Sequence, residues 1–251
     1  GIAANDFAQV LQAMPAGSSV YAATGSAHSI AAGRLSYELG LQGACVAYDT
    51  SCSAALVAGH AALRSAQQSE CTTALLASVN VMLAPGVGWS FALAGMTSLL
   101  GRSRTFDERA DGYARAEACG GASLRRDGAG EAAGPLPLEL CGCSVRQDGR
   151  SASLTAPNGQ AQQALLRASL GDACVVADEM ACAEAHGTGT VLGDPIEAGS
   201  LMGAVASDRA GGGAVAVGGV KANAGHAEPA AGFVGLLKLA VAVVHSSGAP
   251  N

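Results

Sequence analysis

Short apolar runs alternate with stretches of helical spacing along most of this chain of 251 residues. The runs with the length and composition of strands lie at 46–50, 74–83, 119–125, 180–185 and 214–220. Apolar residues recur with helical spacing at 29–40, 52–68, 158–170, 194–206 and 229–245. Because a helix can carry the chain between neighbouring strands of a parallel sheet, this alternation predicts an α/β fold with mainly parallel sheets.

The composition limits the classes of function that the chain can have. Hydrophobic residues make up 49% of the chain and charged residues 14%, enough apolar material for one large domain or two fused halves. The net charge is −6, and no basic run is longer than two residues. These two features exclude a general nucleic-acid binder.

Cysteine usage and hydropathy indicate an intracellular, cytoplasmic protein. The eight cysteines are scattered through apolar segments of a large chain, so we expect reduced thiols rather than a disulfide framework. No run of about 18 apolar residues lacks a glycine or a charge, so no membrane span is expected. The most apolar segment, 230–246, carries Lys238 in its middle and predicts a buried helix.

A stretch rich in glycine, alanine and proline, DGAGEAAGPLP at 127–137, is the clearest break in the chain. It predicts a first half of residues 1–135 and a second half of residues 136–251.

Cys52 lies in DTSCSAAL (49–56), where an apolar run changes into helical spacing. At the start of a helix, unpaired backbone N–H groups and the helix dipole favour a thiolate. Such a thiol can act as a nucleophile close to N–H donors for an oxyanion. From these residues alone, a nucleophile and a small buried filler are both reasonable interpretations.

Two histidines also follow predicted strands. His186 lies in EAHGTGTVLGDPIE (184–197), and His226 lies in KANAGHAEPAAG (221–232). Ligands of open α/β sheets bind at the carboxyl ends of the strands, where both histidines and Cys52 are expected. Three reactive side chains at equivalent positions of the fold indicate a catalytic site.

The same segments resemble a known family. DTSCSAAL is similar to the nucleophile motif DTACSSSL of β-ketoacyl synthases, the ketosynthase domains of polyketide and type I fatty acid synthases. The two histidine segments resemble that family's two histidine motifs. Three further segments match in order and spacing: AAGRLSYELGLQG (31–43), TFDERADGY (105–113) and LTAPNGQAQQALLRASL (154–170).

The resemblance implies a thiolase-like fold, in which two similar halves form α/β/α/β/α layers and the complete protein is a homodimer. It implies a decarboxylative Claisen condensation, with Cys52 carrying the acyl group and His186 and His226 stabilising the enolate of a malonyl-type extender. Thr188 and Thr190 match residues that hydrogen-bond the pantetheine arm, and Lys221 matches a lysine that supports the histidines. The implied substrates are acyl and malonyl-type thioesters on the phosphopantetheine of an acyl carrier protein, and no metal or other cofactor is expected. The fold would be incomplete at both ends of this chain, because the family's N-terminal segment and its C-terminal NSFGxGGxNAH segment are missing.

Several positions depart from the family pattern. Ser51 replaces the usual alanine, and Ala54 and Ala55 replace serines, which are small changes. SLLG (98–101) stands where SPDG is common, and AEAC (116–119) stands where GEGA is common. Whether the 251 residues alone are active therefore stays open.

Three alternatives compete with a condensing enzyme. A thiolase shares the fold, but its second acid–base residue is a cysteine and HGTGT is not its motif. A zinc site on Cys182, Glu184 and His186 is disfavoured because three residues of one short strand converge poorly on one metal. A non-catalytic or remnant partner fragment of a ketosynthase is the main rival.

Overall fold

The computed structural model describes residues 1–126, 138–211 and 213–245. By their contacts the residues form two units, and each is described by itself. The first unit comprises Gly1–Ala94, Arg115–Gly130 and Ala227–Val234. The second unit comprises Gly95–Ala114, Glu131–His226 and Gly235–Asn251. The predicted break at 127–137 lies outside the described residues, so the division into halves 1–135 and 136–251 stays a prediction.

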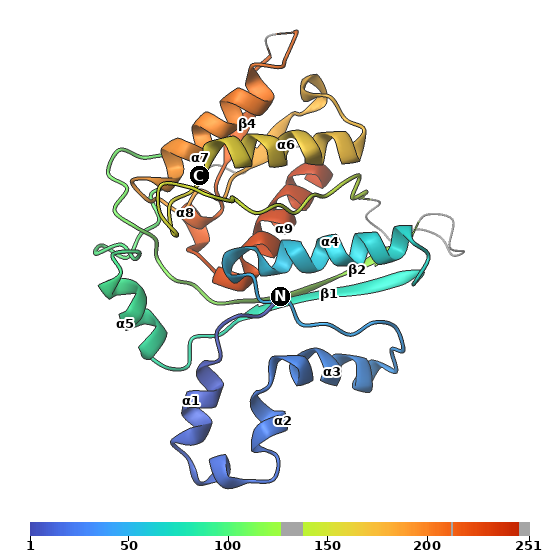
Figure 1. Cartoon of the computed structure of the whole chain (residues 1–251), viewed down its shortest axis with the longest axis vertical. Helices are drawn as coiled ribbons and strands as arrows, with labels where there is room; N and C mark the ends of the chain where they lie inside the picture. Colours follow the sequence, from blue (N-terminus) through green and yellow to red (C-terminus); the bar gives the residue numbers. More distant parts are fainter. Residues whose placement is uncertain (127–137, 212, 246–251) are drawn as a thin grey trace. The chain divides into compact units, whose positions relative to one another are not determined.

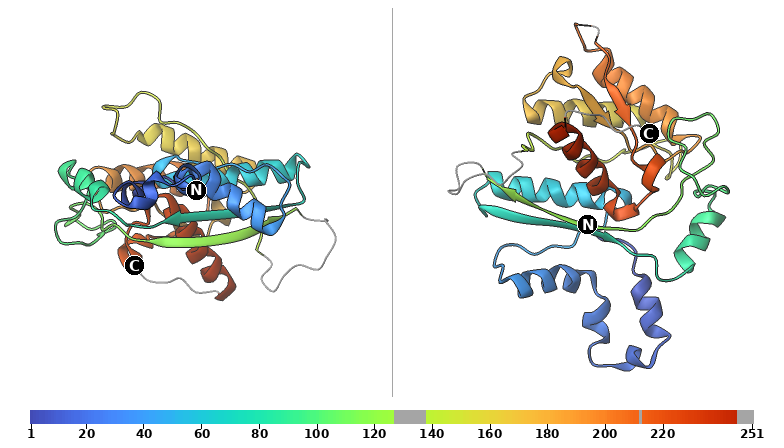
Figure 2. Two further views of the ribbon diagram at one scale, coloured as in Figure 1. Left: turned by 90° about the horizontal axis from the view of Figure 1, so that it is seen from below. Right: turned by 180° about the vertical axis from the view of Figure 1, so that it is seen from behind.

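A two-stranded ribbon with a helix along it forms the centre of the first unit. Strands β1 (Thr73–Asn80) and β2 (Ala118–Arg125) pair over eight residues each, and α4 (Ala54–Gln67) lies along them (Figures 1 and 2). The buried residues Leu76 and Phe233 meet between these elements. Gly120 on β2 is required there, because a Cβ at that position would collide with the ring of Phe233.

The remaining helices of the first unit have between 3 and 12 residues. They are α1 (Asp6–Gln12), η1 (Pro15–Ser18), α2 (Ala22–Ser26), α3 (His28–Leu39), η2 (Ser51–Ser53), α5 (Gly86–Leu93) and η5 (Glu228–Ala230). Helix α3 ends as its sequence predicts, at Gly40 with a left-handed φ of 65°.

Two predictions for the first unit are wrong. Residues 46–50 form no strand. Ile2 N–H donates to the Tyr48 carbonyl at 3.0 Å, and Ser53 N–H donates to the Thr50 carbonyl within a local turn, which is too few contacts for a ladder. The prediction of mainly parallel sheets also fails here, because β1 and β2 are antiparallel. The segment between the two strands contains α5 and brings the chain back beside β1 in the opposite direction.

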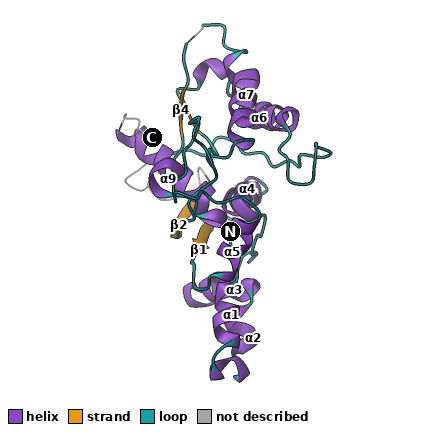
Figure 3. Cartoon of the chain, turned by 90° about the vertical axis from the view of Figure 1, so that its left-hand side faces the viewer, coloured by secondary structure: helices purple, strands orange, loops and turns teal. Residues whose placement is uncertain are grey.

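The second unit contains most of the predicted strand–helix alternation. In chain order its elements are α6 (Gly159–Ala173), η3 (Ala177–Glu179), β3 (Cys182–Glu184), α7 (Gly193–Leu201), η4 (Met202–Ala206), β4 (Ala216–Gly218) and α8 (Lys221–Ala224). Strands β3 and β4 are parallel, as predicted, although each is three residues long. Figure 3 shows that helices and loops make up most of the chain around these strands.

Helix α9 (Ala231–His245) begins in the first unit and belongs to the second from Gly235 onward. Lys238, in its middle, forms an ion pair with Glu184 of β3 at 3.0 Å, and both side chains are largely buried. The prediction of a buried helix is wrong for its second half, where Val241 is 57% exposed. Within the described residues, 228–245 is the one helical stretch whose length and apolar composition would suffice to cross a membrane, a test that core helices also pass.

Candidate active site

The parallel pair β3–β4 brings two of the sequence motifs to one edge. Glu184 is in register with Gly218, and Ala185 N–H donates to the Gly218 carbonyl at 2.8 Å. His186 follows β3 directly, and Lys221 follows β4 at the start of α8. The expectation that the histidine motifs lie at the carboxyl ends of strands is met for this pair.

His226 is fully buried, with 0% of its surface exposed. Its backbone N–H donates to the Ala114 carbonyl at 2.7 Å. The imidazole meets the ring of Tyr113 edge to face, with centroids 4.9 Å apart. It meets the ring of His186 in the same way, with centroids 5.5 Å apart and planes at 89°. The two histidines are therefore neighbours with fixed mutual orientation.

Both imidazoles are held in their neutral form. Burial, the Lys221 ammonium and the neighbouring His186 lower the pKa of His226 to about 2. Burial and the Lys221 ammonium also lower the pKa of His186 below its usual value. The side chain of His186 is exposed to solvent, however, and this exposure weakens the effect of burial on its pKa. At neutral pH each ring carries one N–H that can donate a hydrogen bond.

Lys221 is buried, at 4% exposure, and its ammonium donates to the carbonyl of His186. Lys221 is the first residue of the single-turn helix α8, and this position directs its ammonium toward the His186 carbonyl. The lysine thus fixes the peptide of His186 and supplies the positive charge that disfavours imidazolium.

Thr188 and Thr190 lie in the loop between β3 and α7, and their hydroxyl oxygens are 3.1 Å apart. Thr190 Oγ1 also accepts the N–H of Gly193 at 3.2 Å. A hollow of about 330 Å³ lies beside Thr190 and is also lined by Phe106 and Asp194. A larger hollow of about 590 Å³ lies elsewhere in this unit, between the amino ends of α6 and α7.

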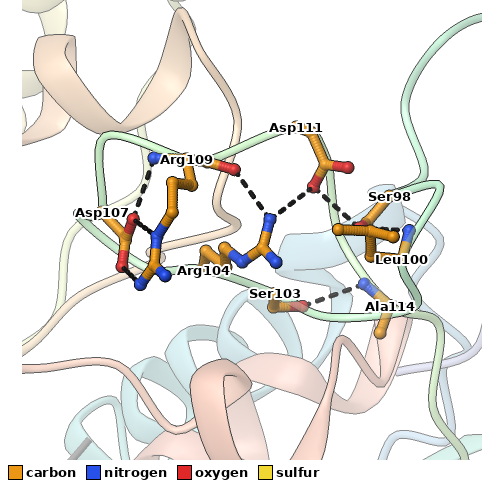
Figure 4. Close-up of polar contacts among 8 residues, drawn as sticks. All are labelled: Ser98, Leu100, Ser103, Arg104, Asp107, Arg109, Asp111 and Ala114. Atoms are coloured by element: carbon orange, nitrogen blue, oxygen red, sulfur yellow. Dashed lines mark hydrogen bonds and ion pairs between the residues drawn. The ribbon is translucent and has the colours of Figure 1, made fainter.

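The loop 98–114 supports both histidine motifs and is itself braced by polar contacts (Figure 4). Arg104 pairs with Asp111, which accepts the hydroxyl of Ser98 at 2.7 Å. Ser103 Oγ accepts the N–H of Ala114, and the Ala114 carbonyl in turn accepts the backbone N–H of His226. The predicted motif TFDERADGY therefore serves as a support for the site.

Three residues of this region were not singled out from the sequence. Asp194 and Glu197 of α7 accept backbone N–H groups of the His186 loop, and Tyr113 packs on His226. Two acidic residues directly after a glycine-rich loop are a usable signal, since such side chains accept N–H groups near helix amino ends. Nothing in the spacing of the aromatic residues points to Tyr113.

Cys52 lies in the first unit, within the 3₁₀ turn η2 (Ser51–Ser53) that leads into α4. Ser51 has a left-handed φ of 54°, so the chain turns sharply just before the cysteine. The hydroxyl of Ser53 donates to the Thr50 carbonyl at 2.9 Å, and Cys52 Sγ is 3.7 Å from Ser51 Oγ. The side chain of Cys52 is half-buried at the amino end of α4.

The second unit brings together five of the six predicted site residues: His186, Thr188, Thr190, Lys221 and His226. Cys52 is held in the first unit. The zinc alternative on Cys182, Glu184 and His186 is disfavoured, because the Glu184 carboxylate already accepts Val220 N–H and pairs with Lys238.

Two family models cover most of the chain. The N-terminal domain of β-ketoacyl synthases matches residues 1–129, and the C-terminal domain matches residues 138–251. The chain belongs to the β-ketoacyl synthase family. One phenolphthiocerol/phthiocerol polyketide synthase protein of Mycobacterium tuberculosis is 44% identical over 254 residues, covering 100% of this chain. Another protein of that synthase is 44% identical over 229 residues, covering 91% of the chain.

Solved ketosynthase structures share the fold of this β-ketoacyl synthase chain. An oxazolomycin ketosynthase domain of Streptomyces albus superposes with a TM-score of 0.83 at 33% identity and covers 91% of the chain. The ketosynthase from module 6 of the bacillaene synthase of Bacillus subtilis gives a TM-score of 0.84 at 29% identity and covers 98% of it. The predicted thiolase-like α/β fold is thus confirmed. The chain spans 12% of both polyketide synthase proteins and 40% and 42% of the two ketosynthase structures.

Proposed function

We propose that this chain carries out the decarboxylative condensation step of polyketide biosynthesis. The observation that supports this most strongly is the edge-to-face pair of imidazoles of His186 and His226, both with lowered pKa values, in a chain of the β-ketoacyl synthase family. Two N–H donors without positive charge can hold the oxygen of an enolate without protonating its carbon.

The proposed reaction begins at Cys52. Its thiolate attacks the carbonyl of an acyl thioester, the carbonyl–sulfur bond breaks, and the carrier's thiol leaves with the proton that Cys52 gave up. A malonyl-type thioester then loses CO₂, and the electron pair of the broken carbon–carbon bond forms the enolate. His186 and His226 donate hydrogen bonds to the enolate oxygen. The enolate carbon attacks the acyl group on Cys52, and the cysteine leaves as thiolate, which takes up a proton.

The substrates in this proposal are carried on the phosphopantetheine arm of an acyl carrier protein. The hydroxyl of Thr190 is suited to hold that arm, since Thr190 lines the hollow of about 330 Å³, and the hydroxyl of Thr188 lies 3.1 Å from it. Lys221 holds the His186 carbonyl and favours the neutral form of both imidazoles, without contacting the substrate. We also propose that the complete protein is a cytoplasmic homodimer and that the reaction needs neither a metal nor a further cofactor.

The test separates enolate formation from acyl loading. His186→Ala and His226→Ala should each lower malonyl decarboxylation by about a hundredfold or more, because one preorganised donor is worth on the order of 3 kcal/mol. Acyl loading should persist in both variants. His245→Ala, at the exposed end of α9, is the matched control and should keep the wild-type rate. Wild-type decarboxylation in both histidine variants would refute these roles. If the unchanged protein also fails to condense the two substrates, the result would favour the remnant-fragment alternative.

A further inference from the structure

The loop from His186 to Thr190 carries three of the proposed functional side chains and has little regular structure of its own. Gly187 and Gly189 have left-handed φ values of 49° and 76°, so the loop turns twice within five residues. Backbone N–H groups in such a loop need partners from elsewhere in the fold.

One side of the loop is held by carbonyl contacts. Thr105 Oγ1 donates to the Gly187 carbonyl at 2.6 Å, and Gly112 N–H donates to the Gly189 carbonyl at 2.9 Å. Lys221 donates to the His186 carbonyl. These three donors fix the direction of the loop's carbonyls. The N–H groups of the loop therefore need acceptors from another part of the fold.

Two carboxylates of α7 accept those N–H groups, one at each end of the loop. Glu197 accepts His186 N–H at 2.5 Å and Gly187 N–H at 2.8 Å, one with each oxygen. Asp194 accepts Gly189 N–H at 3.0 Å and Thr190 N–H at 3.2 Å. Four of the five loop peptides thus donate to α7.

Asp194 is more buried than Glu197 and accepts a hydrogen bond from a further segment. It is 4% exposed, and its second oxygen accepts Phe106 N–H at 2.8 Å, which ties the loop 98–114 to α7. Both carboxylates belong to the first five residues of α7, where the helix dipole stabilises negative charge.

We propose that Glu197 and Asp194 are positioning residues, and that each one holds a different end of the loop. Glu197 sets the peptide of His186 and therefore the aim of its imidazole, whereas Asp194 sets Thr190 and the hold on the pantetheine arm. This inference rests on the proposed function for its kinetic consequences, but the division of the loop is a property of the structure alone.

The division is measured first by residue-resolved amide hydrogen exchange. Glu197→Gln should speed exchange at His186 and Gly187 by tenfold or more and leave Thr190 near its wild-type rate, and Asp194→Asn should give the reverse pattern. Asp178→Asn and Glu179→Gln are matched controls, because these exposed carboxylates also accept backbone N–H groups, away from the loop. Both controls should leave all loop amides unchanged.

Kinetics then separate positioning from simple support of the fold. Glu197→Gln should lower kcat for malonyl decarboxylation about 10- to 100-fold with little change in KM, since small misplacements of a catalytic group carry costs of this size. Asp194→Asn should raise KM for a pantetheine thioester about tenfold, the worth of one or two hydrogen bonds. Glu197→Asp, which keeps the charge but shortens the reach, should fall between wild type and Glu197→Gln.

Several outcomes would overturn the inference. Uniform loosening of the whole loop by either variant contradicts the division, and so do wild-type exchange and kcat in Glu197→Gln. If circular dichroism shows that Asp194→Asn does not fold, Asp194→Glu replaces it and must shift Thr190 exchange and KM. An inactive wild type with the divided exchange pattern would refute the proposed function and leave the positioning role intact.

Discussion

At the residue scale, the site depends on the protonation state of two histidines. A neutral imidazole donates one hydrogen bond, whereas an imidazolium is also an acid strong enough to protonate the enolate carbon. Burial lowers the pKa of His226, and the Lys221 ammonium lowers the pKa of both histidines. The lysine therefore affects the chemistry without any contact to the substrate in the proposed mechanism.

We expect His226 to stay neutral across the usual pH range. Its pKa is about 2 in the folded protein and about 6.5 in an unfolded chain. The unfolded state thus binds one more proton between these values, so the stability linked to His226 is complete above pH 6.5 and is lost as the pH falls below it. The slope approaches 1.4 kcal/mol per pH unit.

The measurement is urea denaturation at pH 7.0 and 5.0 together with NMR of the imidazole nitrogens. His226→Gln, which cannot titrate, should reduce the loss of stability between the two pH values. An imidazolium signal from His226 at pH 6 would contradict the assigned protonation state.

At the element scale, the helices were more predictable than the sheets. The patterns at 29–40 and 158–170 correspond to α3 and α6, because a glycine cap and the Asn158 cap mark their ends in the sequence. Strand direction could not be predicted from alternation alone, since β2 pairs with β1 through contacts 38 or more residues apart in the chain. The apolar run at 46–50 lacks a ladder partner, which is a matter of tertiary contacts and not of composition.

Among elements, α9 offers a direct test of how an apolar helix is held to β3. Lys238→Met should lower the free energy of unfolding by about 3 kcal/mol, because it leaves the buried Glu184 carboxylate without its cation. Adding Glu184→Gln should recover part of that loss. Asp208→Asn, which opens the exposed pair with Arg167, should change stability by less than about 1 kcal/mol.

The measurement is urea denaturation of all four proteins. A Lys238→Met variant as stable as the wild type would show that α9 is held by apolar contacts alone.

At the scale of the whole molecule, the predicted thiolase-like fold is confirmed, whereas the roles of the candidate site residues stay predictions. Cys52, His186 and His226 stand out because each follows an apolar run and precedes a helix or a glycine turn. Asp194 and Glu197 were missed because acidic residues at the start of a helix are ordinary capping features. Their importance depends on which N–H groups they accept, and that is fixed by the folded loop.

We propose that Cys52 receives the acyl group, and peptide-mapping mass spectrometry identifies which residue is acylated. After incubation with a short acyl pantetheine thioester, the account predicts one acyl adduct, on the peptide that carries Cys52. The adduct should be absent in Cys52→Ala and unchanged in Cys45→Ala, which removes an exposed cysteine of the same unit. An adduct on another cysteine, with Cys52 unmodified, would contradict the account.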